Sequence, residues 1–137
     1  MPPLTADRQV ASIAGTRRTL LVAAGAVVFA GADIAIEGGF AKPAYEALNL
    51  SYGGTAVHPV DNSAGLDGDA TVEVDIEIRA MLPSDPGELD SSSIEQIVYW
   101  VDDQTVSLDD NLGTRSVAGV VQDIHEGCLF VRPPMVA

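Results

Sequence analysis

Residues 70–80 alternate strictly between polar and apolar side chains, and this pattern constrains the fold more than any other feature of the chain. A period of two is typical of a β-strand with one face against a core and the other in solvent. At about 3.3 Å per residue such a strand would span roughly 35 Å, so we expect it to bend or to contribute to two sheets. We expect the apolar row in the core and the polar row in solvent: the apolar residues are Val72, Val74, Ile76, Ile78 and Ala80, and the polar residues are Thr71, Glu73, Asp75, Glu77 and Arg79.

Other segments have the composition of short strands joined by tight turns. Gly38-Gly39 separates Asp33–Glu37 from Phe40–Pro43, which is the pattern of a two-residue β-hairpin. Residues 116–124 and Cys128–Arg132 flank a second turn and predict a final hairpin. Ser92 and Glu95 form a capping-box pattern, which predicts one helical turn over residues 93–97. The remaining expected strands are residues 27–29, 96–101 and 105–108, and the most loop-like stretches are residues 44–56 and 81–93.

Length and composition agree with this pattern. A chain of 137 residues is enough for one domain with a modest core, and 13 glycines and 8 prolines supply many turns. We therefore expect an all-β fold: a compact antiparallel β-barrel or sandwich with an extended N-terminal arm and at most one short helix.

Charge is unevenly distributed along the chain. The net charge is −13, with 7 basic against 20 acidic residues, which argues against binding to nucleic-acid phosphates. Residues 1–18 are nevertheless mildly basic, with three arginines and one aspartate. We interpret residues 1–18 as an extended arm and residues 19–137 as the β-rich domain. A short loose tail with no binding role explains the same charge pattern equally well.

The apolar run that follows Arg17-Arg18 imitates a secretory signal peptide, because Ala30-Gly31-Ala32 resembles a cleavage site. However, the run starts only after eighteen residues, and Gly25 and Gly31 divide it into strand-sized pieces. It is also short for a membrane span, and acidic residues close it. We therefore expect this segment to belong to the folded protein and predict no association with a membrane.

Few residues suggest a catalytic or metal-binding site. Residues 61–69 hold three aspartates and Asn62, which could bind Ca²⁺, but Asp, Asn and Gly also form ordinary turns, and we favour a turn. The acidic pairs at 102–103 and 109–110 lack the aromatic surroundings of a sugar site, since aromatic residues make up 5% of the chain. His58 and His125 form no metal-ligand pattern, and we expect Cys128 to be a buried thiol. We predict no catalytic residues, no metal site and no cofactor, so the chain is not expected to be an enzyme.

Three stretches at the start, middle and end of the chain carry a family resemblance. They are Gly15-Thr16-Arg17-Arg18-Thr19-Leu20-Leu21-Val22-Ala23-Ala24-Gly25 with the following Phe29-Ala30-Gly31-Ala32, then residues 60–69, and then residues 101–134. The last stretch includes Gly113-Thr114-Arg115-Ser116-Val117-Ala118-Gly119-Val120-Val121 and Leu129-Phe130-Val131. Together they resemble the capsid decoration, or cement, proteins of tailed phages, and they occur in that family's order. The chain departs from the family pattern between Ile76 and Gln96, where its connection is richer in proline.

The resemblance implies a structural virion protein that is made in the host cytoplasm and binds the outer surface of the expanded capsid. Its expected partners are the major capsid protein and two further copies of itself in a homotrimer, with no nucleic acid and no membrane. The arm would then contact the capsid, with Ala14 as a further apolar anchor, and the contact residues implied are Leu4, Arg8, Val10, Ile13, Arg17 and Arg18. An alternative from another class is a secreted acidic β-domain, cleaved after residue 32, that binds carbohydrate or calcium.

Overall fold

The computed structural model describes Ala6 and residues 16–134. The expected capsid contacts Leu4, Arg8, Val10 and Ile13, together with Ala14, lie outside the described residues. The described part is all-β, as predicted, and no α-helix occurs in it. Its strands are β1 (Arg17–Leu21), β2 (Val27–Val28), β3 (Asp33–Glu37), β4 (Phe40–Pro43), β5 (Ser51–Ala56), β6 (Val60–Asp61), β7 (Thr71–Asp75), β8 (Arg79–Pro83), β9 (Ile97–Trp100), β10 (Thr105–Ser107), β11 (Val117–His125) and β12 (Cys128–Arg132).

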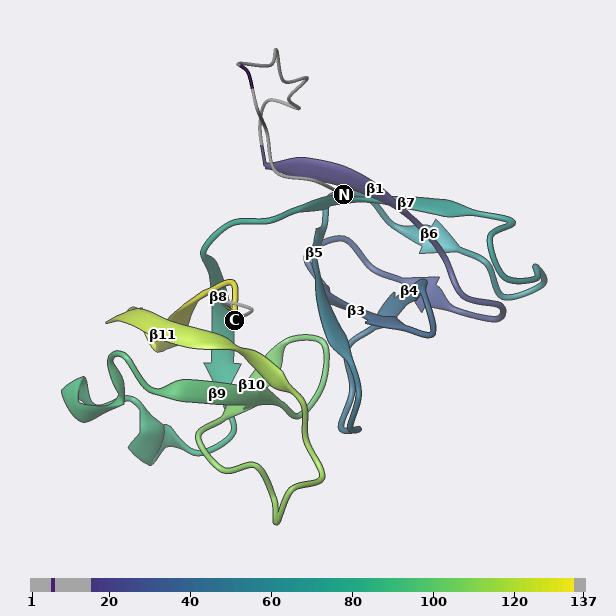
Figure 1. Cartoon of the computed structure of the whole chain (residues 1–137). Helices are drawn as coiled ribbons and strands as arrows, with labels where there is room; N and C mark the ends of the chain where they lie inside the picture. The colour runs from purple at the N-terminus through teal and green to yellow at the C-terminus, as the bar shows by residue number, and fades with distance from the viewer. Residues whose placement is uncertain (1–5, 7–15, 135–137) are drawn as a thin grey trace.

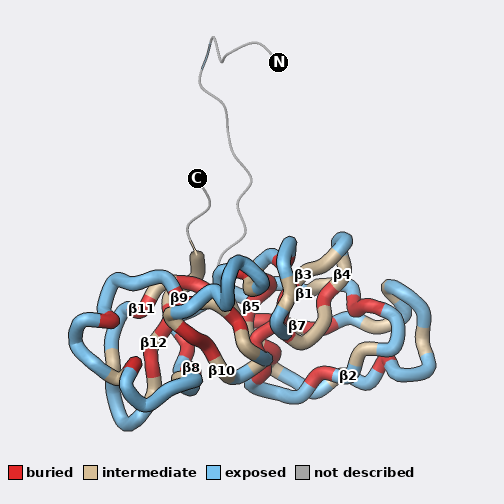
Figure 2. Tube along the Cα trace, turned by 90° about the horizontal axis from the view of Figure 1, so that it is seen from below, coloured by how far each residue is buried: buried red, intermediate tan, exposed pale blue. Residues whose placement is uncertain are grey.

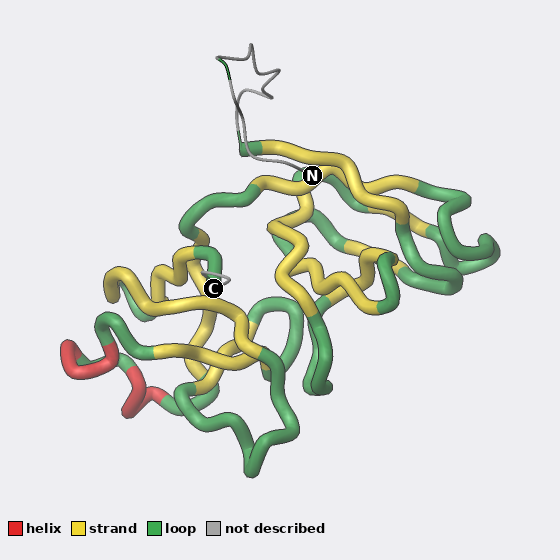
Figure 3. The backbone as a smooth tube through the Cα atoms, in the orientation of Figure 1, coloured by secondary structure: helices red, strands yellow, loops and turns green. Residues whose placement is uncertain are grey.

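The strands form two lobes that lie side by side (Figures 1 and 3). The first lobe is a five-stranded antiparallel sheet in the order β1-β7-β5-β3-β4, with the small β2-β6 ribbon beside it. The second lobe is a closed barrel in the order β10-β8-β12-β11-β9. The β10–β8 pair in this barrel is parallel, and the other pairs are antiparallel.

The alternating segment crosses from one lobe to the other. It contributes β7 to the first sheet and β8 to the barrel, and residues 76–78 form the link between them. The expectation that it would serve two sheets is confirmed, but its alternation does not continue in phase. Arg79, expected in solvent, is buried, whereas Ile78 and Ala80, expected in the core, are exposed. The link interrupts the alternation and shifts it by one residue. Because a shift of one residue exchanges the two faces of a strand, the polar Arg79 of β8 points inward and the apolar Ala80 points outward.

Each lobe has its own buried core (Figure 2). The core of the first lobe contains Val22, Val28, Ile34, Ala41, Ala56, Val72 and Val74. The barrel core is built around the fully buried Trp100, and the first half of the chain adds three residues to it: Ala35, Ala44 and Leu50. The lobes therefore share apolar packing at their junction rather than meeting only through the link.

A buried polar cluster also joins the lobes. Asp33, at the start of β3, is fully buried and accepts hydrogen bonds from Arg79 Nη2 at 2.6 Å and from Trp100 Nε1 at 2.8 Å. Arg79 donates further hydrogen bonds to the main-chain oxygens of Val131 and Ala118 in the barrel. A buried charge is tolerated only when it is paired and hydrogen-bonded, and both charges here meet that condition.

Three details of the sequence-based expectation were wrong. Residues 51–56 were expected in a loop, yet β5 lies in the middle of the first sheet, and residues 81–83 belong to β8. The helical turn expected over residues 93–97 is replaced by two short 3₁₀ turns, η1 (Pro86–Glu88) and η2 (Ser91–Ser93). Capping explains the shift, because Asp85 and Glu88 form the capping box at η1 and Asp90 caps η2.

The boundary expected between arm and domain falls inside a strand. β1 begins at Arg17 and pairs with β7, so Arg17 and Arg18 are part of the first sheet. The hydrogen bond from Ile76 N to Thr16 O extends this pairing by one residue. An arm that precedes the domain can therefore comprise residues 1–15 but not the two arginines.

Candidate functional site: a groove between the two lobes

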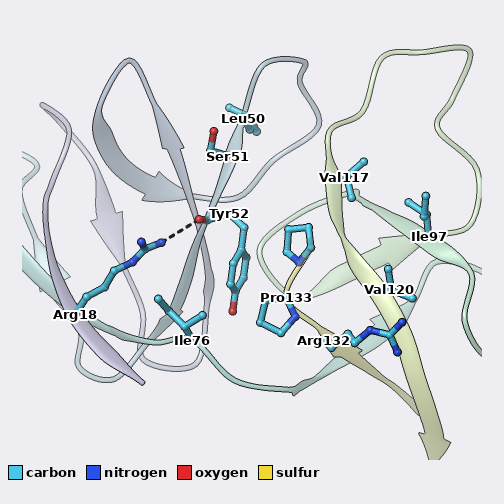
Figure 4. A pocket seen from close by; sticks show the side chains of 11 residues that line it. Arg18, Leu50, Ser51, Tyr52, Ile76, Ile97, Val117, Val120, Arg132 and Pro133 are labelled. Atoms are coloured by element: carbon cyan, nitrogen blue, oxygen red, sulfur yellow. Dashed lines mark hydrogen bonds between the residues drawn. The ribbon is translucent and has the colours of Figure 1, made fainter. Parts of the chain in front are cut away.

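An open groove of about 720 Å³ lies where the first sheet faces the barrel (Figure 4). Residues of the first lobe and of the β7–β8 link form one wall, and residues of β9, β11 and the C-terminal end form the other. Most of the lining side chains are apolar, which is typical of a protein or peptide contact surface. The lining residues are Arg18, Leu50, Ser51, Tyr52, Ile76, Ile97, Val117, Val120, Arg132, Pro133 and Pro134.

Tyr52 is held firmly at the centre of the groove. Its ring stacks on Trp100 with 6.4 Å between ring centroids, and the Arg79 guanidinium lies 4.5 Å from its centroid. Burial raises the pKa of the Tyr52 hydroxyl. The buried cluster that joins the lobes therefore also fixes the floor of the groove. The sequence pointed to none of this, because Tyr52 lies in a segment expected to be a loop.

Two arginines border the groove on opposite sides. Arg18 donates from Nε and Nη2 to Gly53 O, and from Nη2 to Tyr52 O, so its charge meets main-chain oxygens rather than a carboxylate. Arg132 forms two hydrogen bonds with Glu95, at 2.8 and 2.6 Å, and these hold the pKa of the Glu95 carboxyl below its usual value. The rim is thus basic on the Arg18 side and neutralised on the Arg132 side, in a chain that is strongly acidic as a whole.

The structure separates the two arginines that the sequence placed together in the arm. Arg17 lies outside the groove, where it forms exposed ion pairs with Glu73 at 3.0 Å and with Asp75 at 2.8 Å. Arg18 points from the next position of β1 into the groove (Figure 4). Both arginines are exposed but belong to β1 rather than to an extended arm, so a role for them in capsid contact would have to be compatible with these contacts.

The aspartates of residues 61–69 accept hydrogen bonds from main-chain N–H groups, two within the loop and one from Ala24. The Asp61 carboxylate accepts from Ser63 N, Asp67 accepts from Ala24 N, and Asp69 accepts from Leu66 N. The buried Asn62 side chain donates to Ala23 O and Leu66 O. Across residues 16–134 and Ala6, no group of three His, Cys, Asp or Glu side chains is arranged to hold a metal ion. The hydrogen bonds of Asp61 and Asp69 are those of a turn, the preferred interpretation of the sequence, whereas Asp67 ties the loop to Ala24.

The remaining titratable candidates lie apart from the groove. Cys128 is half-buried, not buried as expected, and pairs with His125 across the β11–β12 turn. His125 is exposed, and its Nε2 lies 3.6 Å from Glu126. The second acidic pair is part of the loop before β11, where Asp109 accepts from Asn111 N.

Comparisons with known proteins identify no relative. No family model, no curated protein and no solved structure matches the chain. Within the described ranges, no helix is both long enough and apolar enough to span a bilayer.

Proposed function

We propose that this protein is a structural component of a tailed-phage virion, which binds the outer surface of the expanded capsid, acts as a trimer and stabilises the head. The three stretches that resemble decoration proteins support this proposal, since they occur in that family's order. Strong net acidity also fits, because an outer-surface protein needs no affinity for packaged DNA. The partner would be the major capsid protein.

The observation that carries the proposal is the open edge of β1. β1 is an end strand of the first sheet and has β7 as its sheet neighbour. Just past its end the chain meets β4, where Val22 bridges Ala41 and Ala23 N donates to Ala41 O, so the open edge is confined to the start of β1. Ile76 N donates to Thr16 O, and Val22 N donates to Ala70 O, so the even-numbered residues between them direct their main-chain groups toward β7. The main-chain groups of Arg17 and Thr19 therefore point to the open edge. Such an edge can pair with an extended segment of another protein.

In the sequence, residues 1–15 precede β1, and the resemblance implies that they contact the capsid. A segment that runs along the capsid from residues 1–15 would bring β1 to the same surface, and strand pairing at β1 would supply hydrogen bonds and register. Many such contacts, each weak, would act together on a symmetric capsid because neighbouring copies are linked in trimers.

Cosedimentation with expanded capsids that lack this protein tests the proposal. We expect saturation near one copy per major capsid subunit. Saturation at a few copies per particle would indicate a vertex or neck component instead. Absence of binding, together with absence from purified virions, would reject a role in the virion.

Two proline variants test the edge itself. Thr19→Pro removes an N–H that points away from β7, so we expect it to fold normally and to bind capsids at least tenfold more weakly, a loss of about 1.4 kcal/mol. Leu20→Pro removes an N–H directed at β7 and should instead destabilise the domain. Undiminished capsid binding by folded Thr19→Pro would exclude strand pairing at β1.

The secreted alternative conflicts with the packing of the first lobe. Cleavage after residue 32 would remove β1 and β2 together with the buried Val22 and Val28. These two residues belong to the core of the first lobe, so their loss would expose part of the surface on which Val72 and Val74 pack. The intact mass of the mature protein distinguishes the two proposals, because export would remove about thirty residues.

A further inference from the structure

Leu112 is the most exposed large apolar residue of the described chain. Its exposed fraction is 99%, and it lies in the long loop between β10 and β11, which reaches the lower end of the molecule in Figure 1. A single exposed leucine is ordinary on a protein surface. The backbone at this position is not ordinary, however, and the two features together require an explanation.

The backbone of Leu112 is left-handed, with φ of +58°, between Asn111 at +51° and Gly113 at +83°. Asparagine and glycine accept this conformation, whereas a leucine is strained in it. A polar or glycine residue would suit both the exposure and the conformation better. Positions that break two local preferences at once are expected at functional sites.

The loop around Leu112 is fixed by hydrogen bonds. Asn111 Nδ2 donates to Glu46 at 2.7 Å, Thr114 N donates to Asp110 O at 3.0 Å, and Thr114 Oγ1 donates to Asn111 O at 2.9 Å. Arg115 Nη1 donates to Asp109 O at 2.8 Å. These contacts hold the leucine outward before any partner arrives, so little conformational entropy remains to be lost on binding.

We call Leu112 and the loop residues around it, 109–115, the tip. The surface that complements the tip is the groove between the lobes. Asp109 and Asp110 make the surroundings of Leu112 acidic, while the groove is apolar and has Arg18 on its rim. In the described part of the chain no carboxylate lies within ion-pair distance of Arg18, so its charge is available to an acidic neighbour. A groove of about 720 Å³ readily admits a leucine side chain and its flanking backbone.

We propose that Leu112 of one copy of this chain docks into the groove of a second copy. Tip and groove are different surfaces of the same molecule, so the contact is heterologous and can close into a ring. It would supply the contact between subunits that a trimer requires. The inference concerns association in solution and its test uses no capsid, so its failure and the failure of the proposed function are distinguishable.

Sedimentation of the full-length protein over a range of concentrations tests the contact with two single variants. Leu112→Asn should weaken self-association at least tenfold while leaving the melting temperature unchanged or higher, because asparagine accepts the left-handed backbone. Ile97→Asp should weaken it as well, since Ile97 lines the groove and is 48% exposed. As a matched control, Leu66→Asn alters a leucine that is 73% exposed in another loop and should leave association unchanged.

Mixing the two variants makes the test specific. Leu112→Asn retains an intact groove and Ile97→Asp retains an intact tip, so a labelled sample of one should bind the other with near wild-type affinity for a single contact. The proposal is overturned if the wild-type protein stays monomeric at all concentrations. It is also overturned if Leu112→Asn associates like the wild type, or if the mixture stays dissociated although both variants are folded.

Discussion

Asp33 is the residue on which both lobes depend. It is fully buried and accepts hydrogen bonds from Arg79 of β8, from Trp100 of β9 and, at 3.3 Å, from Thr55 of β5. Removing its charge would leave the Arg79 guanidinium buried without a counter-ion. Breaking a buried ion pair from one side typically costs about 3–5 kcal/mol. We therefore expect Asp33→Asn to lower the free energy of unfolding by about that amount in urea denaturation.

An exposed ion pair provides the control for this variant. Glu37 contacts Lys42 at 2.8 Å, and both side chains are partly solvated. Exposed pairs contribute about 0–1 kcal/mol, so Glu37→Gln should be close to neutral. If Asp33→Asn were as mild as Glu37→Gln, the buried cluster would not be what holds the lobes together.

The loop of residues 61–69 gives a second prediction at the scale of single residues. Its carboxylates already accept hydrogen bonds from Ser63 N, Ala24 N and Leu66 N. We expect neither added Ca²⁺ nor EDTA to change the melting temperature. A ligand that binds only the folded state at a hundred times its Kd would stabilise it by about 2.7 kcal/mol, so thermal melts with and without millimolar Ca²⁺ would reveal such binding.

At the scale of elements, β11 carries a bulge that a glycine makes possible. The register of β11 against β9 shifts between Val117 and Gly119, and a Cβ at Gly119 would collide with the Arg132 carbonyl oxygen of β12. We expect Gly119→Ala to cost about 3 kcal/mol, because the clash is with backbone that cannot move aside. Gly127→Ala, in the β11–β12 turn, meets open space and should cost about 1 kcal/mol from its positive φ alone. Gly119 also has a positive φ, of +156°, so its variant carries both clash and strain, and the difference between the two variants in chemical denaturation measures the clash. Equal losses would contradict the role assigned to the bulge.

The limits of β1 lead to a pair of truncations. Deleting residues 1–16 leaves β1 intact, so we expect a folded domain whose capsid binding is at least tenfold weaker, a loss of about 1.4 kcal/mol. Deleting residues 1–22 also removes β1 and the buried Val22, and we expect that variant to unfold. Circular dichroism and cosedimentation with capsids are the measurements. Unfolding of the shorter deletion would place residues before β1 in the core.

At the scale of the whole molecule, the two lobes should unfold as one unit. They share the Asp33 cluster, and Ala35, Ala44 and Leu50 pack into the barrel core. Trp100 is the single tryptophan and lies at this junction, so its fluorescence reports on the contact between lobes. We expect fluorescence and far-UV circular dichroism to give coincident urea transitions, as in two-state unfolding. Separate transitions would show that each lobe is stable alone.

Local patterns predicted much of the fold but little of the groove. The hairpin at Gly38-Gly39 formed as expected, because both glycines adopt the positive φ that a two-residue turn requires. β5 was missed because Ser51, Gly53 and Gly54 resemble a loop. Only the neighbouring strands β3 and β7 make this segment a strand. The groove depends on β5, so no local signal could have identified Tyr52 as part of a binding surface.

The sequence by itself determined the all-β class, the main hairpins and the unequal charge, because turn chemistry and period-two alternation act over a few neighbouring residues. The tertiary structure alone decided that Arg79 would be buried and Ile78 exposed. The reason is physical: the link after β7 shifts the phase of the chain by one residue, and Asp33, distant in sequence, compensates the charge that this shift buries.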